Sequence, residues 1–227
     1  SKLIDARGGI IMPGLVNTHT HAAMTCFRGL ADDLPLMTWL QEYIFPAEAK
    51  LTSEVVYRGT LLACAEMILS GTTTFCDMYL FEDAVAEAAQ EAGIRAVVGE
   101  VLYDFPSPNY GPVEEGLKYT ETLINKWRDD PLITIAVEPH SPYLCSSDLL
   151  KKTKAIADRN AAPMVIHLSE SEHEVTEVRA KCGRSPVELL ADIGFLSPNL
   201  IADHCVALTQ GDISLLKAFD VKVAHNP

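Results

Sequence analysis

Two histidines, His19 and His21, follow an apolar run and alternate along the chain, which places both side chains on one face of an extended strand. A third histidine, His167, ends a second apolar run, and Glu170 follows it three residues later. Imidazoles from two strand ends can hold a divalent metal, and a nearby carboxylate can move protons to and from an attacking water. These residue types at this spacing predict a hydrolytic metal site.

The chain has 227 residues, of which 18 are basic and 31 are acidic, so its formal net charge is −13. An acidic chain offers no basic face for phosphates or anionic lipids, and we therefore expect neither nucleic acid nor a membrane as a partner. The hydrophobic content of 48% is typical of a globular protein with a large core. No apolar run approaches the length of a transmembrane helix.

The six cysteines form no C-x-x-C pair, and several lie within apolar runs, as Cys64 and Cys76 do. Such cysteines are typical of buried thiols in a reducing compartment. Charge appears at Lys2 and Asp5, before any apolar run of the kind that a secretory signal needs. We therefore expect a cytoplasmic protein.

Short apolar runs alternate with amphipathic stretches along the whole chain, which indicates a parallel sheet with helices outside it. A doubly wound sheet and a (β/α)8 barrel both fit, but the polar candidates follow six different strands, and only a barrel turns all strand ends toward one pocket. We therefore predict a TIM barrel of the metal-dependent hydrolase type. The expected strands are residues 15–17, 72–76, 94–101, 132–137, 164–168, 199–203 and 221–224, and the expected helices are residues 53–70, 82–92, 112–129, 147–160, 171–181, 185–193 and 209–219.

The predicted barrel is incomplete, because seven strands can be counted where a closed barrel has eight. We assign residues 12–227 to about seven βα units, with strand eight missing. Two connections, residues 20–51 and 103–111, are long and lie on the expected active face. They are candidate lids over the site.

Several motifs together resemble one family of enzymes. The run M-P-G-L-V-N-T-H-T-H at residues 12–21 looks like the opening strand of the amidohydrolase superfamily. Three further stretches are more specific: C-A-E-M at 64–67 with G-T-T-T-F-C-D-M-Y at 71–79, E-P-H-S-P-Y at 138–143, and H-L-S-E at 167–170. The combination, which extends over essentially the whole chain, resembles the 5-methylthioadenosine/S-adenosylhomocysteine deaminases and their triazine-hydrolase relatives.

Carried over residue by residue, this resemblance implies a metal centre with a proton-transfer group beside it. His19, His21 and His167 would bind one divalent metal, with zinc favoured over iron. Glu170 would shuttle a proton between the attacking water and the substrate. His204, in the motif A-D-H-C, would orient that water.

The resemblance also assigns two residues to substrate binding. Glu66 would accept hydrogen bonds from ribose hydroxyls, and because its neighbours in the sequence are apolar we expect it to be buried, where an unpaired carboxylate would be costly. His140 would contact the nucleoside, although its position between Pro139 and Pro142 suits a turn residue nearly as well. The implied reaction converts an adenosine-type nucleoside, such as 5-methylthioadenosine or S-adenosylhomocysteine, to the inosine analogue and ammonia.

The chain departs from the family pattern in three ways. Family members carry a metal-binding aspartate after strand eight, so we expect the natural chain to continue past Pro227. Residues 1–11 are the only part that could link to the small β-sandwich that flanks the barrel in the family. Glu100 stands at the end of the third strand, where some relatives place an arginine, and this leaves the 5′ group of the substrate open.

Other functions remain open from the sequence. A guanine deaminase or a triazine chlorohydrolase would use the same opening strand. A two-metal hydantoinase would need a lysine on the fourth strand, and residues 132–138 contain none, so a single metal is favoured. The alternative from a different class is a non-catalytic metal-binding fragment. The oligomeric state is also open, a homo-oligomer included.

Overall fold

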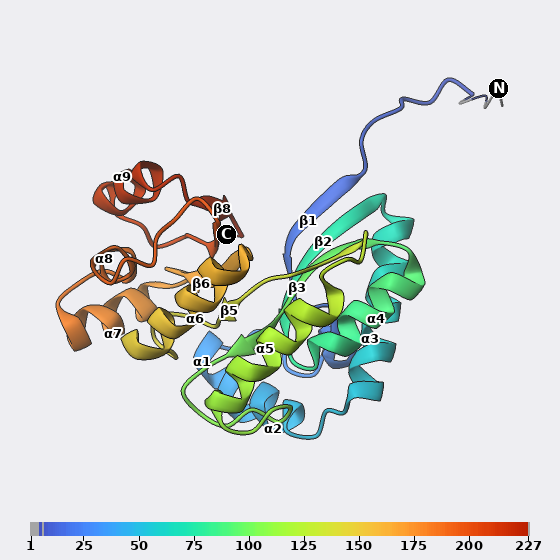
Figure 1. Ribbon diagram of the computed structural model, residues 1–227. Coiled ribbons are helices and arrows are strands. Elements are labelled where there is room, and N and C mark those ends of the chain that lie inside the picture. The colour runs from blue at the N-terminus through green and yellow to red at the C-terminus, as the bar shows by residue number, and fades with distance from the viewer. Residues whose placement is uncertain (1–4, 6, 227) are drawn as a thin grey trace.

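Parallel strands alternate with helices in the computed structural model, which describes Asp5 and residues 7–226 (Figure 1). The strands are β1 (Leu15–Thr20), β2 (Thr72–Tyr79), β3 (Arg95–Leu102), β4 (Ile133–Ile135), β5 (Glu138–Pro139), β6 (Met164–Leu168), β7 (Leu200–His204) and β8 (Lys222–Ala224). The outer helices are α3 (Ser53–Leu69), α4 (Glu82–Ala92), α5 (Val113–Trp127), α6 (Ser147–Asn160), α7 (Glu172–Cys182), α8 (Pro186–Asp192) and α9 (Gln210–Ala218). Four short helical segments precede α3: η1 (Ala22–Phe27), α1 (Leu36–Thr38), η2 (Trp39–Ile44) and α2 (Phe45–Glu48).

Hydrogen-bonding side chains and glycine set the helix ends close to where the sequence predicts them. The Thr52 side chain accepts the Val55 N–H at the start of α3, and Ser146 caps α6 in the same way. Gly93, with φ at 72°, ends α4 in the left-handed conformation that glycine adopts most readily. The predicted bounds of α4 and α6 are confirmed to the residue, and the remaining predicted helices are confirmed to within two residues.

All strand pairs are parallel, in the order β1-β2-β3-β4, with β5 also on β3, and β6-β7-β8. Val137 connects the two groups, because its N–H donates to the Pro163 carbonyl at 2.9 Å and its carbonyl accepts the Val165 N–H at 3.2 Å. The strands therefore form one continuous parallel sheet, with the helices on its outer side (Figure 1).

A contact between strands that are far apart in the sheet order shows that the sheet curls. Nδ1 of His19, on β1, lies 2.8 Å from Oδ2 of Asp203, on β7. Such a contact requires the sheet to bend around an axis, as it does in a TIM barrel. The predicted fold, a partial TIM barrel, is confirmed. No hydrogen-bonded pairing joins β8 to β1 within the described residues, and Val16 and Val223 on these strands are exposed.

The expected fourth strand, residues 132–137, is shorter in the structure, where it is β4 alone, and the two-residue strand β5 follows just beyond its expected end. Between them, Ala136 bonds to β3 and Val137 bonds to the segment before β6. Glu138 then turns its buried side chain toward β3, where a Cβ at Gly99 would lie 2.4 Å from Glu138 Cγ. Glycine at position 99 makes this close approach possible.

The two predicted lid segments differ in structure. The stretch 20–51 was expected as an irregular connection, but it contains four helical segments, of which η2 is a π-helix, a form often found at functional sites. It packs closely on α3 at Gly59, where a Cβ would lie 2.7 Å from the Ala23 carbonyl oxygen. In residues 103–111, Ser107 and Gly111 exchange two backbone hydrogen bonds of 2.8 and 3.0 Å.

Residues 7–14 form no helix or strand and extend away from the barrel (Figure 1). Residues 1–4 and 6 of the expected linking segment, residues 1–11, lie outside the described residues, so that prediction is untested. Among the helices that the structure describes, none has the length and apolar character needed to cross a bilayer.

The core between β2 and its neighbours should dominate stability. Phe75 on β2 is fully buried, so Phe75→Ala removes a large apolar side chain and leaves a cavity. We expect the free energy of unfolding in urea to fall by about 3–5 kcal/mol. Leu69→Ala is the control, because Leu69 is 88% exposed, and its effect should stay below about 0.5 kcal/mol. Equal effects of the two substitutions would contradict this placement of β2.

Candidate active site

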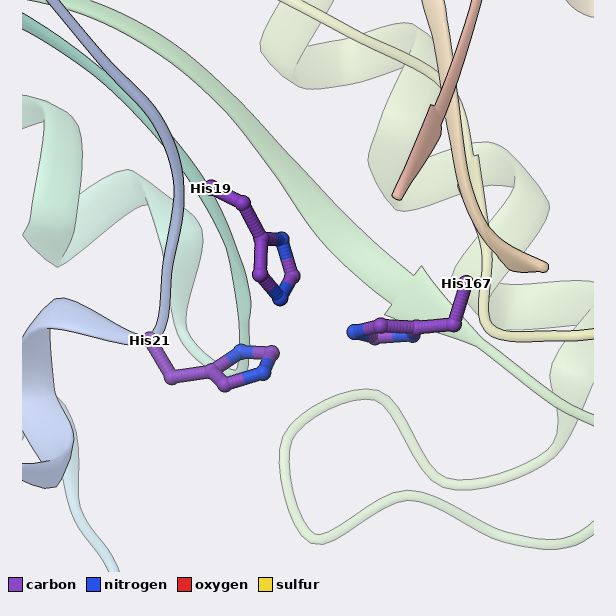
Figure 2. Close-up of side chains that lie close together, drawn as sticks. All are labelled: His19, His21 and His167. Carbon is purple, nitrogen blue, oxygen red and sulfur yellow. The ribbon is translucent and has the colours of Figure 1, made fainter. Parts of the chain in front are cut away.

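The three predicted metal ligands converge at the mouth of the barrel. His19 lies at the end of β1, His21 follows that strand, and His167 lies on β6 opposite both of them (Figure 2). One ring nitrogen of each lies within 4.8 Å of those of the other two, and the ring centroids are 4.9–5.3 Å apart. The structure thus brings together, from two distant parts of the chain, the three residues that the sequence singled out.

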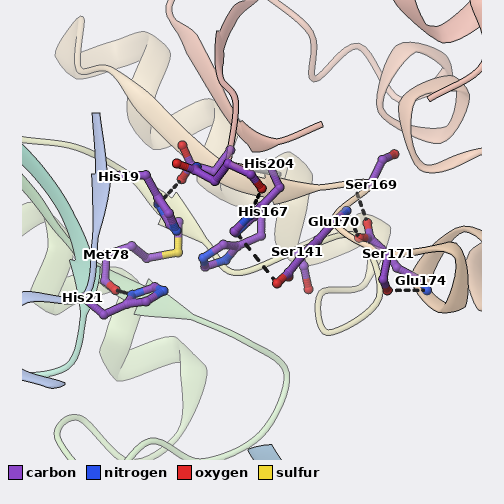
Figure 3. A network of polar contacts seen from close by, with 12 residues as sticks. His19, His21, Met78, Ser141, His167, Ser169, Glu170, Ser171, Glu174 and His204 are labelled. Carbon is purple, nitrogen blue, oxygen red and sulfur yellow. Dashed lines mark hydrogen bonds and ion pairs between the residues drawn. The ribbon is translucent and has the colours of Figure 1, made fainter. Parts of the chain in front are cut away.

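Each of the three imidazoles is oriented by an acceptor at Nδ1. His21 donates to the Met78 carbonyl at 2.5 Å, and His167 donates to the His140 carbonyl at 3.0 Å. Nδ1 of His19 lies 2.8 Å from the Asp203 carboxylate (Figure 3). Because carbonyl oxygens and carboxylates only accept, these contacts place the proton on Nδ1 and leave the Nε2 lone pair free, which is the arrangement that metal-binding histidines have in proteins. The residues fit a divalent metal.

Burial keeps the rings at this centre uncharged. It lowers the pKa of His21 to about 4, that of His140 to about 3, and that of His167 well below its usual value, and the neighbouring histidines add to each effect. Neutral imidazoles are the form that binds metal. Near pH 7, little energy is therefore needed to deprotonate His21 and His167.

Strand β2 holds the end of β1 in place, through residues that the sequence analysis did not single out. Asp77 accepts the N–H of Ala22 at 2.5 Å, directly after His21, while Met78 accepts from the His21 ring. Asp77 is fully buried, and burial raises its pKa to about 7. In the sequence, D-M-Y at residues 77–79 follows a β-branched run. This pattern indicates the end of a strand and does not by itself indicate a functional site.

The predicted proton shuttle and water-orienting residue face each other beside the metal ligands. Oε1 of Glu170 lies 4.0 Å from Nε2 of His204. The His204 ring lies 4.8 Å from that of His19 and 5.4 Å from that of His167, measured between centroids. Both side chains are partly exposed, at 26% and 14% respectively, so solvent and substrate can reach them.

His140 lies at a turn and also next to the metal-ligand candidates. Its backbone carbonyl orients His167, and its ring, whose centroid is 4.7 Å from that of His167, hydrogen-bonds through Nδ1 to the Ser141 hydroxyl at 3.0 Å. The ring also lines a cavity next to the metal ligands. His140 is therefore held by the turn and presented to the cavity at once.

The cavity beside the histidines is small and largely apolar, with a volume of about 70 Å³. Segment 36–48 and the ends of β2 and β3 supply most of its walls. Its lining residues are His21, Met24, Trp39, Leu40, Ile44, Phe45, Glu48, Met78, Tyr79, Leu80, Val101, Tyr103, His140 and His167.

The expectation that Glu66 is buried is wrong, and the structure does not bring Glu66 to this cavity. Glu66 lies on the outer face of α3 and forms a two-point ion pair with Arg28, with N–O distances of 2.8 and 3.0 Å. The apolar residues near Glu66 in the sequence did not indicate a buried helix face, because Leu62 and Leu69 are themselves exposed, at 49% and 88%.

The carboxylate that does line the cavity is Glu48, at the end of α2. Burial raises its pKa to about 7. Glu48 was not among the predicted site residues, because it lies in residues 20–51, which were predicted as a long connection. The available signal was an acidic residue close to Trp39 and Phe45, on a segment expected to cover the active face.

The curled parallel sheet and the histidine cluster at its strand ends are those of a metal-dependent hydrolase barrel, and the chain belongs to the amidohydrolase family, whose pattern matches residues 10–227. It is 64% identical, over its whole length, to the 5-methylthioadenosine/S-adenosylhomocysteine deaminase of Syntrophobacter fumaroxidans, and covers 52% of that relative. It is 48% identical to the 5′-deoxyadenosine deaminase of Methanothermobacter thermautotrophicus, with 99% of the chain aligned to 53% of that protein.

A solved structure supports the same relationship. An adenosine deaminase from Xanthomonas campestris, with bound zinc, superposes with a TM-score of 0.92 at 41% identity, over 95% of this chain and 49% of that one. The chain thus spans about half the length of the curated relatives that it matches.

Loss of one imidazole should abolish tight metal binding while the fold is kept. We expect His167→Ala to weaken zinc binding by more than about 100-fold, because even the loss of a group that hydrogen-bonds to a metal ligand costs about 10- to 100-fold. Zinc retained after dialysis, measured by atomic absorption, tests this. His173→Ala, at a 60% exposed histidine on α7, is the control and should retain zinc like the parent protein. Full zinc retention by His167→Ala would remove that residue from the site.

Proposed function

We propose that this protein is a metal-dependent deaminase of adenosine-type nucleosides, and that 5-methylthioadenosine, S-adenosylhomocysteine or a similar compound is its substrate. The observation that carries the proposal is the convergence of one ring nitrogen from each of three histidines beside an apolar cavity, with His204 next to these histidines and Glu170 next to His204. The substrates for which the related deaminases are named support this substrate class.

We infer that His19, His21 and His167 hold one zinc ion, which is the metal bound in the related adenosine deaminase structure. When bound, the metal would act as a Lewis acid that activates water and polarises the substrate. The chain's own contribution is to orient the three rings through the acceptors at their Nδ1 atoms, while burial favours the neutral form of His21 and His167.

Glu170 then carries the protons of the reaction. Its carboxylate takes a proton from the attacking water, delivers it to the purine ring nitrogen, and assists the departure of ammonia from C6. His204, 4.0 Å away, orients the water. General acid–base catalysis of this kind contributes on the order of 10²- to 10⁴-fold to the rate.

We infer that the residues of the cavity walls contact the remaining parts of the substrate. Trp39, Phe45 and Tyr103 offer aromatic surface to a purine and to an apolar 5′ group. His140 contacts the base. Glu48 is the carboxylate in the lining, and we assign to it the recognition of the ribose hydroxyls, in place of Glu66.

Removing the Glu170 carboxylate should abolish turnover but not binding. We expect Glu170→Gln to lower kcat for 5-methylthioadenosine by about 10²- to 10⁴-fold with little change in KM. Ammonia release measured with the full-length protein gives both constants, and its zinc content should be unchanged. A near-normal kcat would exclude Glu170 from proton transfer. A wild-type preference for guanine or a chlorotriazine over every adenosine analogue would contradict the proposed function.

Glu48 should control ribose recognition in a pH-dependent way. We expect Glu48→Gln to raise KM for nucleosides by about 10- to 100-fold, the value of one or two charged hydrogen bonds, and to change KM for free adenine far less. Because burial raises the Glu48 pKa to about 7, the wild-type carboxylate gains a proton as the pH falls from 8 to 6. Its KM for nucleosides should rise over that range, and the Gln variant should lose this dependence.

Glu66→Gln is the matched control for that experiment, because Glu66 faces solvent and pairs with Arg28. Its KM should equal that of the wild type at every pH. A large increase in KM for Glu66→Gln, with none for Glu48→Gln, would return the ribose role to Glu66.

A further inference from the structure

A buried carboxylate that belongs neither to the metal centre nor to the cavity holds the backbone on which Glu170 stands. Glu174 is 3% exposed. Its Oε1 accepts the N–H of Ser169 at 3.0 Å, and its Oε2 accepts the N–H of Glu170 at 2.8 Å (Figure 3). Both carboxylate oxygens are therefore engaged by the two residues that follow the end of β6.

This use of Glu174 differs from that of similarly placed acids elsewhere in the chain. Glu174 is the third residue of α7, after the N-cap Ser171. On α8 and α9 the acid at the same helical position, Glu188 or Asp212, accepts the N–H of its own N-cap residue and completes a capping box. The Glu174 carboxylate instead reaches further back along the chain, to Ser169 and Glu170.

The segment that Glu174 holds is tied to the other side of the site. Ser169 has a φ of 50°, an uncommon conformation for serine, and its carbonyl accepts the N–H groups of Val206 and Ala207 at 3.0 and 2.8 Å. These residues directly follow His204 and Cys205, so one serine joins the loop of Glu170 to the loop of His204. The Glu174 carboxylate, in turn, holds the backbone N–H of Ser169.

We propose that Glu174 is a positioning residue, which clamps the Ser169–Glu170 backbone so that the Glu170 carboxylate and the His204 ring face each other across the reacting atoms. This inference rests on the proposed function. Two converging N–H groups need two acceptor oxygens, and a charged carboxylate makes these bonds about twice as strong as neutral ones. An amide in its place would turn an N–H donor toward one of the two N–H groups.

The test compares Glu174→Gln with Asp212→Asn in the full-length protein. Asp212 is a 2% exposed acid at the same helical position, but its partners are Thr209 and Ser185. Both substitutions should lower the melting temperature to a similar degree, because each weakens the hydrogen bonds that a buried carboxylate accepts. Only Glu174→Gln should lower kcat, by about 100-fold, because a small misplacement of a catalytic group is sufficient for a loss of this size. KM and zinc content should stay within about twofold of the wild type.

Hydrogen exchange gives a readout that does not depend on turnover. The amide protons of Ser169 and Glu170 should exchange faster in Glu174→Gln, and at the wild-type rate in Asp212→Asn. Should Glu174→Gln fail to fold, Glu174→Asp keeps the charge but is too short to reach both N–H groups, and it should lower kcat and speed exchange in the same direction.

An unchanged kcat in Glu174→Gln, or an equal loss of kcat in Asp212→Asn, would overturn the positioning role. A wild-type protein that releases no ammonia from any nucleoside would overturn the proposed function instead. In that case unchanged amide exchange in Glu174→Gln would still overturn the clamp, and faster exchange would support it.

Discussion

The acceptors at the Nδ1 atoms of three buried histidines are the constraint on which the site depends. Each acceptor comes from a different neighbour of the ring that it holds: Met78 from β2, His140 from the turn after β5, and Asp203 from β7. The first two require correct strand pairing, and the third requires the sheet to curl. The three Nε2 lone pairs therefore meet at one point only when most of the barrel has formed around them.

The metal ligands were predictable because the signal for them is local. Alternation along a strand puts His19 and His21 on one face, and an apolar run that ends in His167 marks a second strand end. The β/α alternation then brings such ends to one side of the barrel. The acceptors were not predictable, because Met78 and His140 act through backbone carbonyls that any residue has, and the contact of Asp203 with His19 depends on the curvature of the sheet.

The exposure of Glu66 was mispredicted for a related reason. Apolar residues surround Glu66 on α3, but Leu62 and Leu69 are exposed, so apolar neighbours in the sequence did not indicate a buried face. Glu48 lies in a stretch of short helical segments, one of them a π-helix, which the 3.6-residue pattern of a long amphipathic helix does not reveal. Only packing of that stretch over the mouth of the barrel gives its carboxylate a place in the cavity.

The metal centre and one wall of the cavity are built from different parts of the chain, and this has an evolutionary consequence. The clustered histidines lie at the strand ends of the barrel, whereas Trp39, Ile44, Phe45 and Glu48 lie on one segment between β1 and α3. Substitutions in that segment can reshape the pocket without removing a histidine of the cluster. A lineage can therefore change the pocket in small steps, each of which keeps the histidine cluster intact.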